Sequence, residues 1–381
     1  MNLIFGGLTA LFLAMSGAAL FHLRWSRRLP ALQDLPADPE AKRMLSSVVI
    51  AARDEEARIE RTIRLLLAQT GVELEIIVVD DRSTDRTSEI LNRLAKEDAR
   101  VRRIRVETLP EGWLGKCHAC HTGASLARGE WILFTDADCW LKPDVFARAL
   151  RVAARAQVNH VALTPGVVPE TIPARAWNLA FLVSFASWFA GVNRNKPRAY
   201  FGMGAFNLVQ TAMYQRCGGY QALRLTVLDD VRLGLLVRRA GGKTRAFIGG
   251  DDVECHWGTT ARAMIKLMEK NYFATMDYRT WLVIAAGIVA ALAMGLCIAG
   301  PFTGTWAGIA APCAWLTMAL PAWICARRLG WGIAGALMTP FIFPLMFYAV
   351  ARSAALTLRQ GGIWWRETFY PLDQLRTGGV K

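Results

Sequence analysis

EIIVVDDRSTD, residues 75–85, is the stretch that decides the fold class of this chain. Four β-branched apolar residues followed by polar turn formers are typical of a strand buried on both faces. Residues 47–52, 101–106 and 131–135 show comparable strand patterns, and residues 59–67 have the apolar spacing of a helix. Strands that alternate with helices predict an α/β domain with a mostly parallel sheet.

Acidic side chains follow two of these predicted strands. Asp80 and Asp81 end one strand, and Asp136 and Asp138 follow another. Ligands bind at the carboxyl ends of strands in such sheets. Because alternate residues of an extended segment share a face, Asp136 and Asp138 are expected to point the same way and offer oxygen ligands to Mg²⁺ or Mn²⁺. Two solvated carboxylates in a turn are the alternative.

A third acidic pair, Asp229 and Asp230, opens a helical stretch with the sequence LDDVRLG, residues 228–234. Carboxylates stabilise the positive end of a helix, so simple capping is one interpretation. The functional interpretation is a general base that takes a proton from an attacking hydroxyl group.

The order and spacing of VVDD, TDAD and LDDVRLG resemble the motifs of the family 2 glycosyltransferases, which have the GT-A fold. GWLGK at residues 112–116 is similar to the lysine motif of this family, and the resemblance covers roughly residues 46–271. Segments beginning at Gly204 and Gly218 resemble its acceptor side. The flanking apolar helices and the C-terminal tail are similar to membrane-bound lipid glycosyltransferases, including ceramide glucosyltransferase and bacterial hopanoid and carotenoid relatives.

The resemblance implies an inverting reaction, in which an acceptor oxygen attacks the anomeric carbon and a nucleoside diphosphate leaves. It implies Asp230 as the base, with Asp229 in the place usually held by Glu. It implies Asp136 and Asp138 as holders of a Mg²⁺ or Mn²⁺ ion. The residues implied to bind the nucleotide sugar are Asp80, Asp81, Lys116, Asp136 and Arg53.

The region of the acceptor and the diphosphate is implied to include Gly204, Trp257, Arg262, Trp365 and Arg366. Many relatives carry a Gln/Arg-x-x-Arg-Trp motif after the base. The Arg-Trp pair is absent from residues 256–264, so Trp257 and Arg262 are candidates to replace it in part. Its absence disfavours a processive polysaccharide synthase.

Apolar segments at both ends predict membrane association. Residues 1–23 contain no Asp, Glu, Lys or Arg and are followed by arginines, which predicts a retained transmembrane anchor with the following chain in the cytosol. Residues 280–326 predict a transmembrane hairpin that turns at residues 300–304. Residues 329–351 predict a spanning or re-entrant segment, which Pro340 and Pro344 are expected to break or kink.

These segments divide the chain into parts. Residues 24–44 are a predicted linker, residues 45–275 the GT-A domain and residues 352–381 a cytosolic tail. Residues 176–192 predict either an interfacial helix, since Trp and Phe lie beside cationic residues, or a buried core helix. Together these segments predict a multi-pass protein of the inner (cytoplasmic) membrane with its catalytic domain in the cytosol.

The chain has 45 Lys and Arg against 31 Asp and Glu, a formal net charge of +14. With 53% hydrophobic residues it is not a disordered protein. Basic excess fits anionic lipid, phosphate or nucleic acid. No nucleic-acid-binding module is recognisable, so membrane lipids and a diphosphate are the expected partners, and nucleic acid is not.

CHACH at residues 117–121 matches the attachment pattern of c-type haem. A structural zinc site is a second alternative, with Cys139 and Cys255 as possible further ligands. The third interpretation is an ordinary helix, because the segment continues in helical register from Lys116 to Leu126.

The function most consistent with the sequence is a membrane-integral transferase that moves a sugar from a nucleotide-diphosphate sugar, expected to be a UDP-sugar, to a hydroxyl group of a lipid. Transfer to polyprenyl phosphate is an alternative that needs no base. A membrane scaffold or binding protein without catalysis is a third, which the intact acidic set disfavours.

Overall fold

The computed structural model describes residues 2–34, 44–256 and 258–380. The chain forms two compact units. The first, called here the α/β unit, comprises residues 30–168, 191–257 and 374–381. The second, the helical unit, comprises residues 1–29, 169–190 and 258–373.

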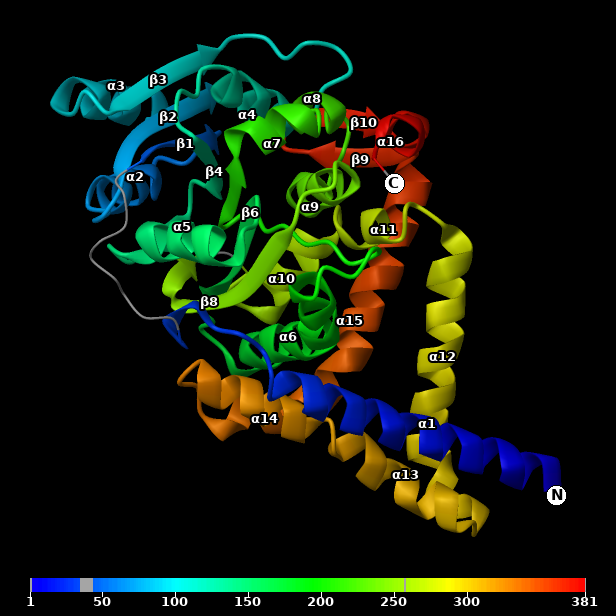
Figure 1. Ribbon diagram of the computed structural model, residues 1–381. Helices are drawn as coiled ribbons and strands as arrows, with labels where there is room; N and C mark the ends of the chain where they lie inside the picture. Colours follow the sequence, from blue (N-terminus) through cyan, green and yellow to red (C-terminus); the bar gives the residue numbers. More distant parts are fainter. Residues whose placement is uncertain (1, 35–43, 257, 381) are drawn as a thin grey trace. The chain divides into compact units, whose positions relative to one another are not determined.

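The α/β unit is built on an eight-stranded sheet with the order β3-β2-β1-β4-β7-β6-β8-β5 (Figure 1). Neighbours among β3, β2, β1 and β4 run parallel, as do β6 and β8, whereas β7 and β5 pair antiparallel with their neighbours. The strands are β1 Leu45–Ala52, β2 Glu73–Asp81, β3 Val101–Val106, β4 Trp131–Asp136, β5 Cys139–Leu141, β6 His160–Val167, β7 Asn207–Gln210 and β8 Thr244–Cys255. The predicted α/β class is confirmed.

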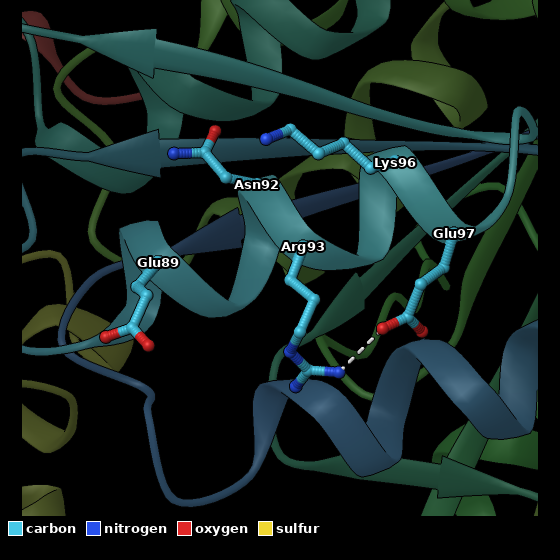
Figure 2. A pocket seen from close by; sticks show the side chains of 5 residues that line it. All are labelled: Glu89, Asn92, Arg93, Lys96 and Glu97. Carbon is cyan, nitrogen blue, oxygen red and sulfur yellow. Dashed lines mark hydrogen bonds and ion pairs between the residues drawn. The ribbon is translucent and has the colours of Figure 1, made fainter.

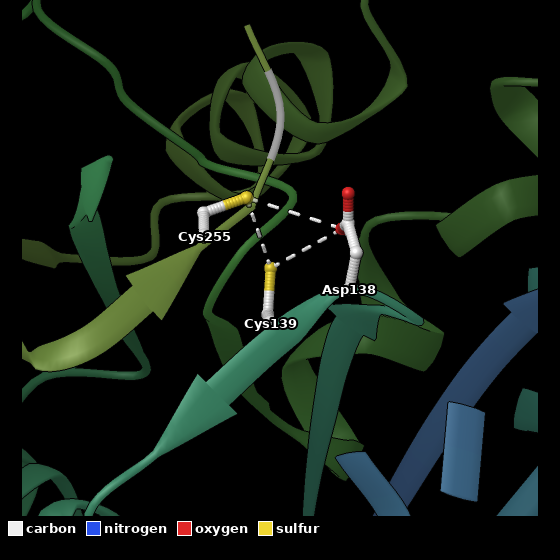
Figure 3. Close-up of side chains that lie close together, drawn as sticks. All are labelled: Asp138, Cys139 and Cys255. Carbon is white, nitrogen blue, oxygen red and sulfur yellow. Dashed lines mark hydrogen bonds between the residues drawn. The ribbon is translucent and has the colours of Figure 1, made fainter. Parts of the chain in front are cut away.

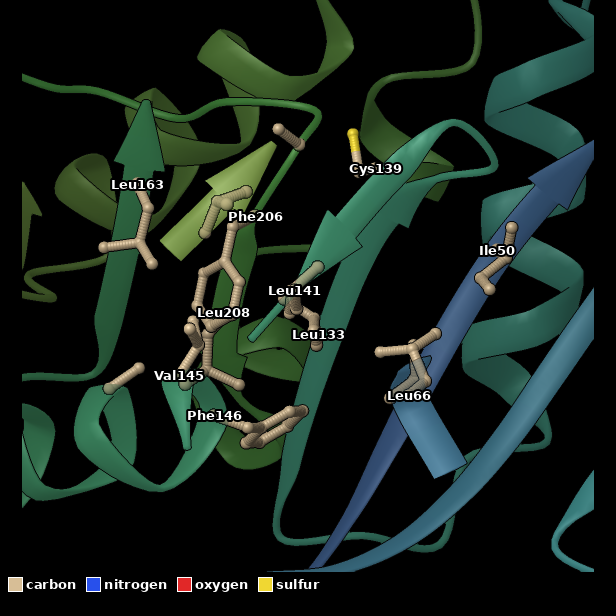
Figure 4. Packing of buried hydrophobic residues seen from close by; sticks show 14 of the residues in the cluster. Ile50, Leu66, Leu133, Cys139, Leu141, Val145, Phe146, Leu163, Phe206 and Leu208 are labelled. Carbon is tan, nitrogen blue, oxygen red and sulfur yellow. The ribbon is translucent and has the colours of Figure 1, made fainter. Parts of the chain in front are cut away.

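The two faces of β2 explain why its sequence is apolar without alternation. Ile76 and Val78 pack into a core that includes side chains of α2 (Ile59–Leu67), α3 (Thr87–Glu97) and α5 (Val145–Ala156). Their neighbours Ile77 and Val79 pack on the other face with Ala119 of α4 (Gly115–Ser125). Helices therefore cover both faces of the parallel half, as buried parallel strands require. Figure 4 shows the larger core cluster around Phe146 and Phe206.

The helical unit contains three segments that are long and apolar enough to cross a membrane within the described part of the chain: Thr280–Thr303, Trp306–Arg328 and Ile333–Gln360. A short 3-10 helix, Gly300–Thr303, ends the first of these segments, and the membrane hairpin stays a prediction. Its elements are α1 Asn2–Ser26, most of α6 Ile172–Asn193, α10 Ala261–Met268, α11 Tyr272–Thr275, α12 Thr280–Ala299, α13 Trp306–Leu316, α14 Ala319–Arg328, α15 Ile333–Gln360, β9 Gly362–Trp365 and β10 Thr368–Pro371.

Helix α15 corrects the expectation of a break at Pro340 and Pro344, because it is continuous through both prolines. Pro344 has no N–H to donate to the carbonyl of Pro340, four residues earlier. The indole Nε1–H of Trp315 in α13 donates to that carbonyl oxygen instead, at 3.0 Å. A neighbouring helix thus satisfies the acceptor that the proline leaves open.

Helix α6 covers the segment expected to lie at a membrane interface or in the core. Trp177 and Leu179 are fully buried, whereas Trp188 is 40% exposed. Gly335 of α15 packs against Arg175 and Leu179, and a Cβ at that position would touch both. One side of α6 is therefore core-facing, as the second alternative expects, and its placement at an interface stays a prediction.

Candidate active site

A partly buried ion pair links the lysine motif to the second acidic motif. Lys116, in the first turn of α4, places its Nζ 2.6 Å from Oδ1 of Asp136, the last residue of β4. The same Nζ lies 4.0 Å from Oδ2 of Asp229, the first residue of α9 (Asp229–Arg239). Burial opposes the charge on Lys116, but Asp136, Asp229 and Asp230 together raise its pKa well above the ordinary value. Lys116 is therefore a fixed ammonium among carboxylates.

The two residues of the third acidic pair have different surroundings. Asp229 is buried, and its Oδ2 accepts a 2.9 Å hydrogen bond from the hydroxyl of Tyr220, in α8 (Gly219–Ala222). Asp230 is partly exposed. Its Oδ2 accepts from the backbone N–H of Gly204 at 2.7 Å, and its Oδ1 from that of Val231 at 2.8 Å. Asp230 is thus the oriented carboxylate that other molecules can reach.

The pKa of Asp230 is raised to about 6, first by burial and second by the neighbouring charge of Asp229. Lys116 acts in the opposite direction and lowers it. A carboxylate with a raised pKa is a stronger base than an ordinary aspartate and is still ionised at neutral pH.

The loop that carries Gly204 packs closely against α9, because glycines on both sides allow the two backbones to approach. A Cβ on Gly202 would collide with the backbone oxygen of Asp230, and a Cβ on Gly234 would collide with that of Phe201. A Cβ on Gly204 would lie 2.5 Å from Oδ2 of Asp136. The loop can therefore reach both carboxylates only because these positions carry no side chain.

Gly234→Ala is expected to lower the stability of the protein by roughly 1–3 kcal/mol, the usual cost of overpacking. The new methyl group would push the Phe201 carbonyl away from α9 and shift Gly204 from Asp230. Thermal unfolding of the detergent-solubilised protein measures the effect. Gly287→Ala is the matched control, because a Cβ there meets nothing within 4 Å. An unchanged unfolding temperature in Gly234→Ala would contradict the close approach.

The second acidic motif is not an extended segment, so the predicted reason for its two carboxylates sharing a face is wrong. Strand β4 ends at Asp136, and Ala137 and Asp138 form a turn that leads into β5. The Asp136 carboxylate meets Lys116. The Asp138 carboxylate lies 3.8 Å from the Cys139 sulfur and 3.9 Å from the Cys255 sulfur.

The chemistry of this turn nevertheless fits a hard divalent cation. Burial, and after it the charge of Asp136, raise the pKa of Asp138. A divalent cation between two carboxylates relieves this repulsion, and carboxylate oxygens are the ligands that Mg²⁺ and Mn²⁺ prefer. Asp136 and Asp138 are therefore suitable residues to hold such an ion.

The two aspartates of the first acidic motif have different partners, and Asp80 is held by the protein itself. Asp80 is fully buried, and its carboxylate accepts hydrogen bonds from the Ser83 N–H, the Ser88 hydroxyl, and Arg103 and Arg105 of β3. Burial alone would raise its pKa, but these donors outweigh it and lower the pKa to about 2. Protein groups thus bond to both oxygens of the Asp80 carboxylate, and a contact of Asp80 with a nucleotide stays a prediction.

Asp81 and Arg53 lie at the ends of neighbouring parallel strands. Arg82 donates two hydrogen bonds to the Asp81 carboxylate, at 2.8 and 3.1 Å. A Cβ on Gly115 would collide with that carboxylate, so Asp81 lies against the start of α4. Arg53 follows β1, and its Nε is 3.9 Å from a carboxylate oxygen of Asp54.

The remaining predicted residues belong to the helical unit or are outside the described residues. Arg262 is in α10, Trp365 ends β9, and Arg366 follows with a positive φ of 55°. The Lys270 Nζ lies 4.0 Å from the centre of the Trp365 ring. Trp257 lies outside the described residues.

Two residues of the site were missed as functional residues. Tyr220 holds Asp229, and Asn207 of β7 donates from its amide to the backbone oxygen of Asp230 at 3.1 Å. The His160 Nε2 lies 2.5 Å from the Asn207 Oδ1, and this contact fixes the orientation of the amide. Tyr220 belongs to the segment that begins at Gly218, which indicates no role for it, and no motif contains Asn207.

The CHACH segment is an ordinary part of α4. Cys117 and Cys120 are buried, and the rings of His118 and His121 pack against Trp113, with the His121 ring stacked at 5.1 Å. Within residues 2–34, 44–256 and 258–380, the only group of three side chains placed to share a metal ion is Asp138, Cys139 and Cys255. The helical interpretation of the segment is confirmed.

A surface pocket on α3 is separate from these carboxylates. Figure 2 shows that its lining side chains all come from this one helix and that Arg93 pairs with Glu97, at 2.9 Å. Arg93 also pairs with Glu60 of α2. Arg93 is therefore already paired with two carboxylates. The residues that line this pocket include none of the predicted site residues.

Comparison with known proteins gives the family that the sequence matches and a solved structure that shares its fold. The model of the family described as glycosyl transferase family 2 matches residues 47–224. The chain is 34% identical over 133 residues to the 4,4'-diaponeurosporenoate glycosyltransferase of Staphylococcus haemolyticus, covering 34% of each protein. It is 27% identical over 195 residues to the beta-monoglucosyldiacylglycerol synthase of Nostoc, covering 49% of this chain and 40% of that protein. The match to the first of these relatives thus spans about a third of its length.

A solved structure shares the fold over most of the chain. The mannosyltransferase from Pyrobaculum calidifontis in complex with GDP-Man and Mn²⁺ aligns with a TM-score of 0.53 at 21% identity, covering 92% of this chain and 98% of that one. The α/β unit has the mixed, mostly parallel sheet of the GT-A fold. Residues 47–224 of this chain thus match glycosyl transferase family 2, and the matched segment contains the first two acidic motifs and the lysine motif.

Proposed function

We propose that this protein is a membrane-integral inverting glycosyltransferase that moves a sugar from a nucleotide-diphosphate sugar to a hydroxyl group of a lipid. The observation that carries the proposal is the Asp230 carboxylate. It is oriented by Gly204, has a raised pKa, and belongs to the same cluster as the Lys116 ammonium. The attack by a hydroxyl group requires a base, and the departure of a diphosphate requires a cation.

In the proposed reaction Asp230 takes the proton of the acceptor hydroxyl as its oxygen attacks the anomeric carbon. The bond from that carbon to the diphosphate breaks, and Lys116 stabilises the negative charge that develops on the leaving group. Asp136 and Asp138 are the residues that would hold Mg²⁺ or Mn²⁺, which supplies further neutralisation of the diphosphate. A phosphate acceptor is already ionised and needs no base, so the oriented Asp230 favours a hydroxyl acceptor over polyprenyl phosphate.

The lipid nature of the acceptor is supported by the apolar helices and by relatives named for a carotenoid and a diacylglycerol product. We propose a multi-pass protein of the cytoplasmic membrane with the α/β unit in the cytosol. The positive-inside rule supports a cytosolic α/β unit, because Arg27 and Arg28 follow α1 and Arg327 and Arg328 end α14.

UDP-sugars are the first donors to test. The test is transfer of labelled sugar from a panel of nucleotide sugars to extracted membrane lipids by the purified protein.

Removal of divalent metal is expected to abolish this transfer, and Mn²⁺ or Mg²⁺ is expected to restore it. Asp136→Asn and Asp138→Asn should each weaken the restoring ion, which appears as a higher Mn²⁺ concentration at half-maximal activity. Turnover that survives metal stripping would contradict the role of these two residues.

The pH dependence follows from the direction of the Asp230 shift. A base works only when deprotonated, and the raised pKa means that Asp230 takes up protons at a higher pH than an ordinary aspartate. Turnover should therefore fall as the pH drops below about 6 and should not fall near pH 7.5. A profile of kcat from pH 4.5 to 8 measures this, and a flat profile down to about pH 4.5 would exclude a base with a raised pKa.

A further inference from the structure

Two cysteines face each other across the β5–β8 ladder beside the Asp136–Asp138 turn. Cys139 is directly opposite Cys255 in this antiparallel pair. Hydrogen bonds from Lys142 N–H to Asp252 and from His256 N–H to the Asp138 carbonyl, at 3.0 and 3.3 Å, flank the position. Their alternation makes Cys139 and Cys255 a pair without ladder hydrogen bonds, the kind in which side chains approach most closely.

The three donor atoms form a compact triangle (Figure 3). The two sulfurs are 3.5 Å apart, and the Asp138 Oδ1 is 3.8 Å from one and 3.9 Å from the other. In a tetrahedral zinc site, bonds of about 2.3 Å to sulfur and about 2.0–2.2 Å to oxygen place two sulfurs about 3.8 Å apart and sulfur and oxygen about 3.5 Å apart. The observed edges differ from these by a few tenths of an ångström, so an ion fits with small side-chain movements.

The triangle offers two sulfur ligands besides an oxygen, whereas Asp136 and Asp138 together offer oxygen ligands alone. Both cysteines are fully buried, and each sulfur contacts the other and Asp138. Thiolates select soft or borderline ions such as Zn²⁺, whereas carboxylates alone suit Mg²⁺ and Mn²⁺. Asp138 is partly exposed and gives the ion a route to the two buried sulfurs.

We propose that Asp138, Cys139 and Cys255 form a second metal site, which binds a thiophilic divalent cation of the zinc type with water or a substrate oxygen as the fourth ligand. Binding replaces two S–H bonds by two metal–sulfur bonds and releases both protons to solvent. The ion also takes the Asp138 carboxylate. The consequence for transfer rests on the proposed function, in which Asp138 helps to hold Mg²⁺ or Mn²⁺. Zn²⁺ at the second site removes this ligand from that ion and therefore inhibits transfer.

Metal binding itself is tested without any activity measurement. The full-length, reduced protein in detergent is titrated with Co²⁺, and the thiolate-to-cobalt charge-transfer band is followed in the near ultraviolet. One Co²⁺ per chain should give the band, and one equivalent of Zn²⁺ should remove it. Cys139→Ser and Cys255→Ser should each lose most of the band. The matched control, Cys217→Ser, should keep it.

X-ray absorption at the zinc edge of the wild-type protein gives a readout that needs no variant. Two sulfur neighbours at about 2.3 Å and further oxygen neighbours support the site. No sulfur neighbour, four sulfur neighbours, or a cobalt band that survives in Cys255→Ser would overturn it.

The inhibitory consequence has its own readout. Zn²⁺ should lower Mn²⁺-supported transfer at least tenfold in the wild type and much less in Cys255→Ser. If zinc binds with two sulfurs but this difference is missing, the role of Asp138 in the proposed function fails while the metal site stands. If zinc does not bind but transfer depends on Mn²⁺, the second site fails while the proposed function stands.

Discussion

Asp230→Asn is expected to lower turnover by about 10²–10⁴-fold, the usual contribution of a positioned base. The amide keeps the size of the side chain and can still accept a hydrogen bond from Gly204 or Val231, but it cannot take a proton from the acceptor. Donor binding should persist, because Lys116 and Asp136 are unchanged. Single-turnover assays with the labelled donor measure the loss, and binding of the nucleoside diphosphate measures the retained site.

Two variants separate this effect from a general loss of charge or stability. Asp251→Asn removes a carboxylate at an exposed position and should leave turnover unchanged. Asp230→Glu keeps the base and should retain more activity than Asp230→Asn. If Asp230→Asn turned over like the wild type, the base would be another group.

Lys116→Met is the second change with a large expected effect, a loss of about 10²–10³-fold in kcat, as for removal of one preorganised stabilising group. The variant keeps the length of the side chain but leaves the Asp136 carboxylate without the ammonium 2.6 Å away. Lys116 also lowers the pKa of Asp230, so its removal should move the fall in activity to a higher pH than in the wild type.

The shifted pH profile distinguishes loss of this charge from a merely distorted site. Lys96→Met, on the exposed side of α3, removes an ammonium group without touching the cluster and is the control. Lys116→Met with an unchanged kcat and an unchanged pH profile would contradict the role assigned to the ammonium.

The parallel half of the sheet and the positions of the acidic motifs could be predicted because they depend on local pattern. Apolar runs identify β2 and β4, and the carboxylates follow them directly. The short antiparallel strands β5 and β7 have no comparable signal, since they are three and four residues long. Without β5, the turn at Asp138 could not be distinguished from an extended segment.

The role of each carboxylate could not be predicted, because it depends on partners distant in sequence. Asp80 is occupied by Arg103 and Arg105 across the β2–β3 pair. Asp229 is buried beneath Tyr220, whereas Asp230 remains partly exposed. In α15, likewise, the carbonyl that Pro344 leaves without a helical donor accepts from the indole of Trp315 in another helix. Spacing identifies such residues as candidates, and packing decides what each one does.

Transfer of a sugar from a nucleotide sugar to a lipid hydroxyl changes the mass of the lipid, so lipid mass spectrometry tests it without an intermediate assay. Lipids are compared from cells that express the wild-type chain, the Asp230→Asn variant or neither. We expect a lipid heavier by one sugar residue only with the wild type. The added mass identifies the class of sugar, and the fragment ions should show a glycosidic link to a hydroxyl oxygen. No new lipid, the same lipid with Asp230→Asn, or a sugar linked through phosphate would contradict the proposed transfer.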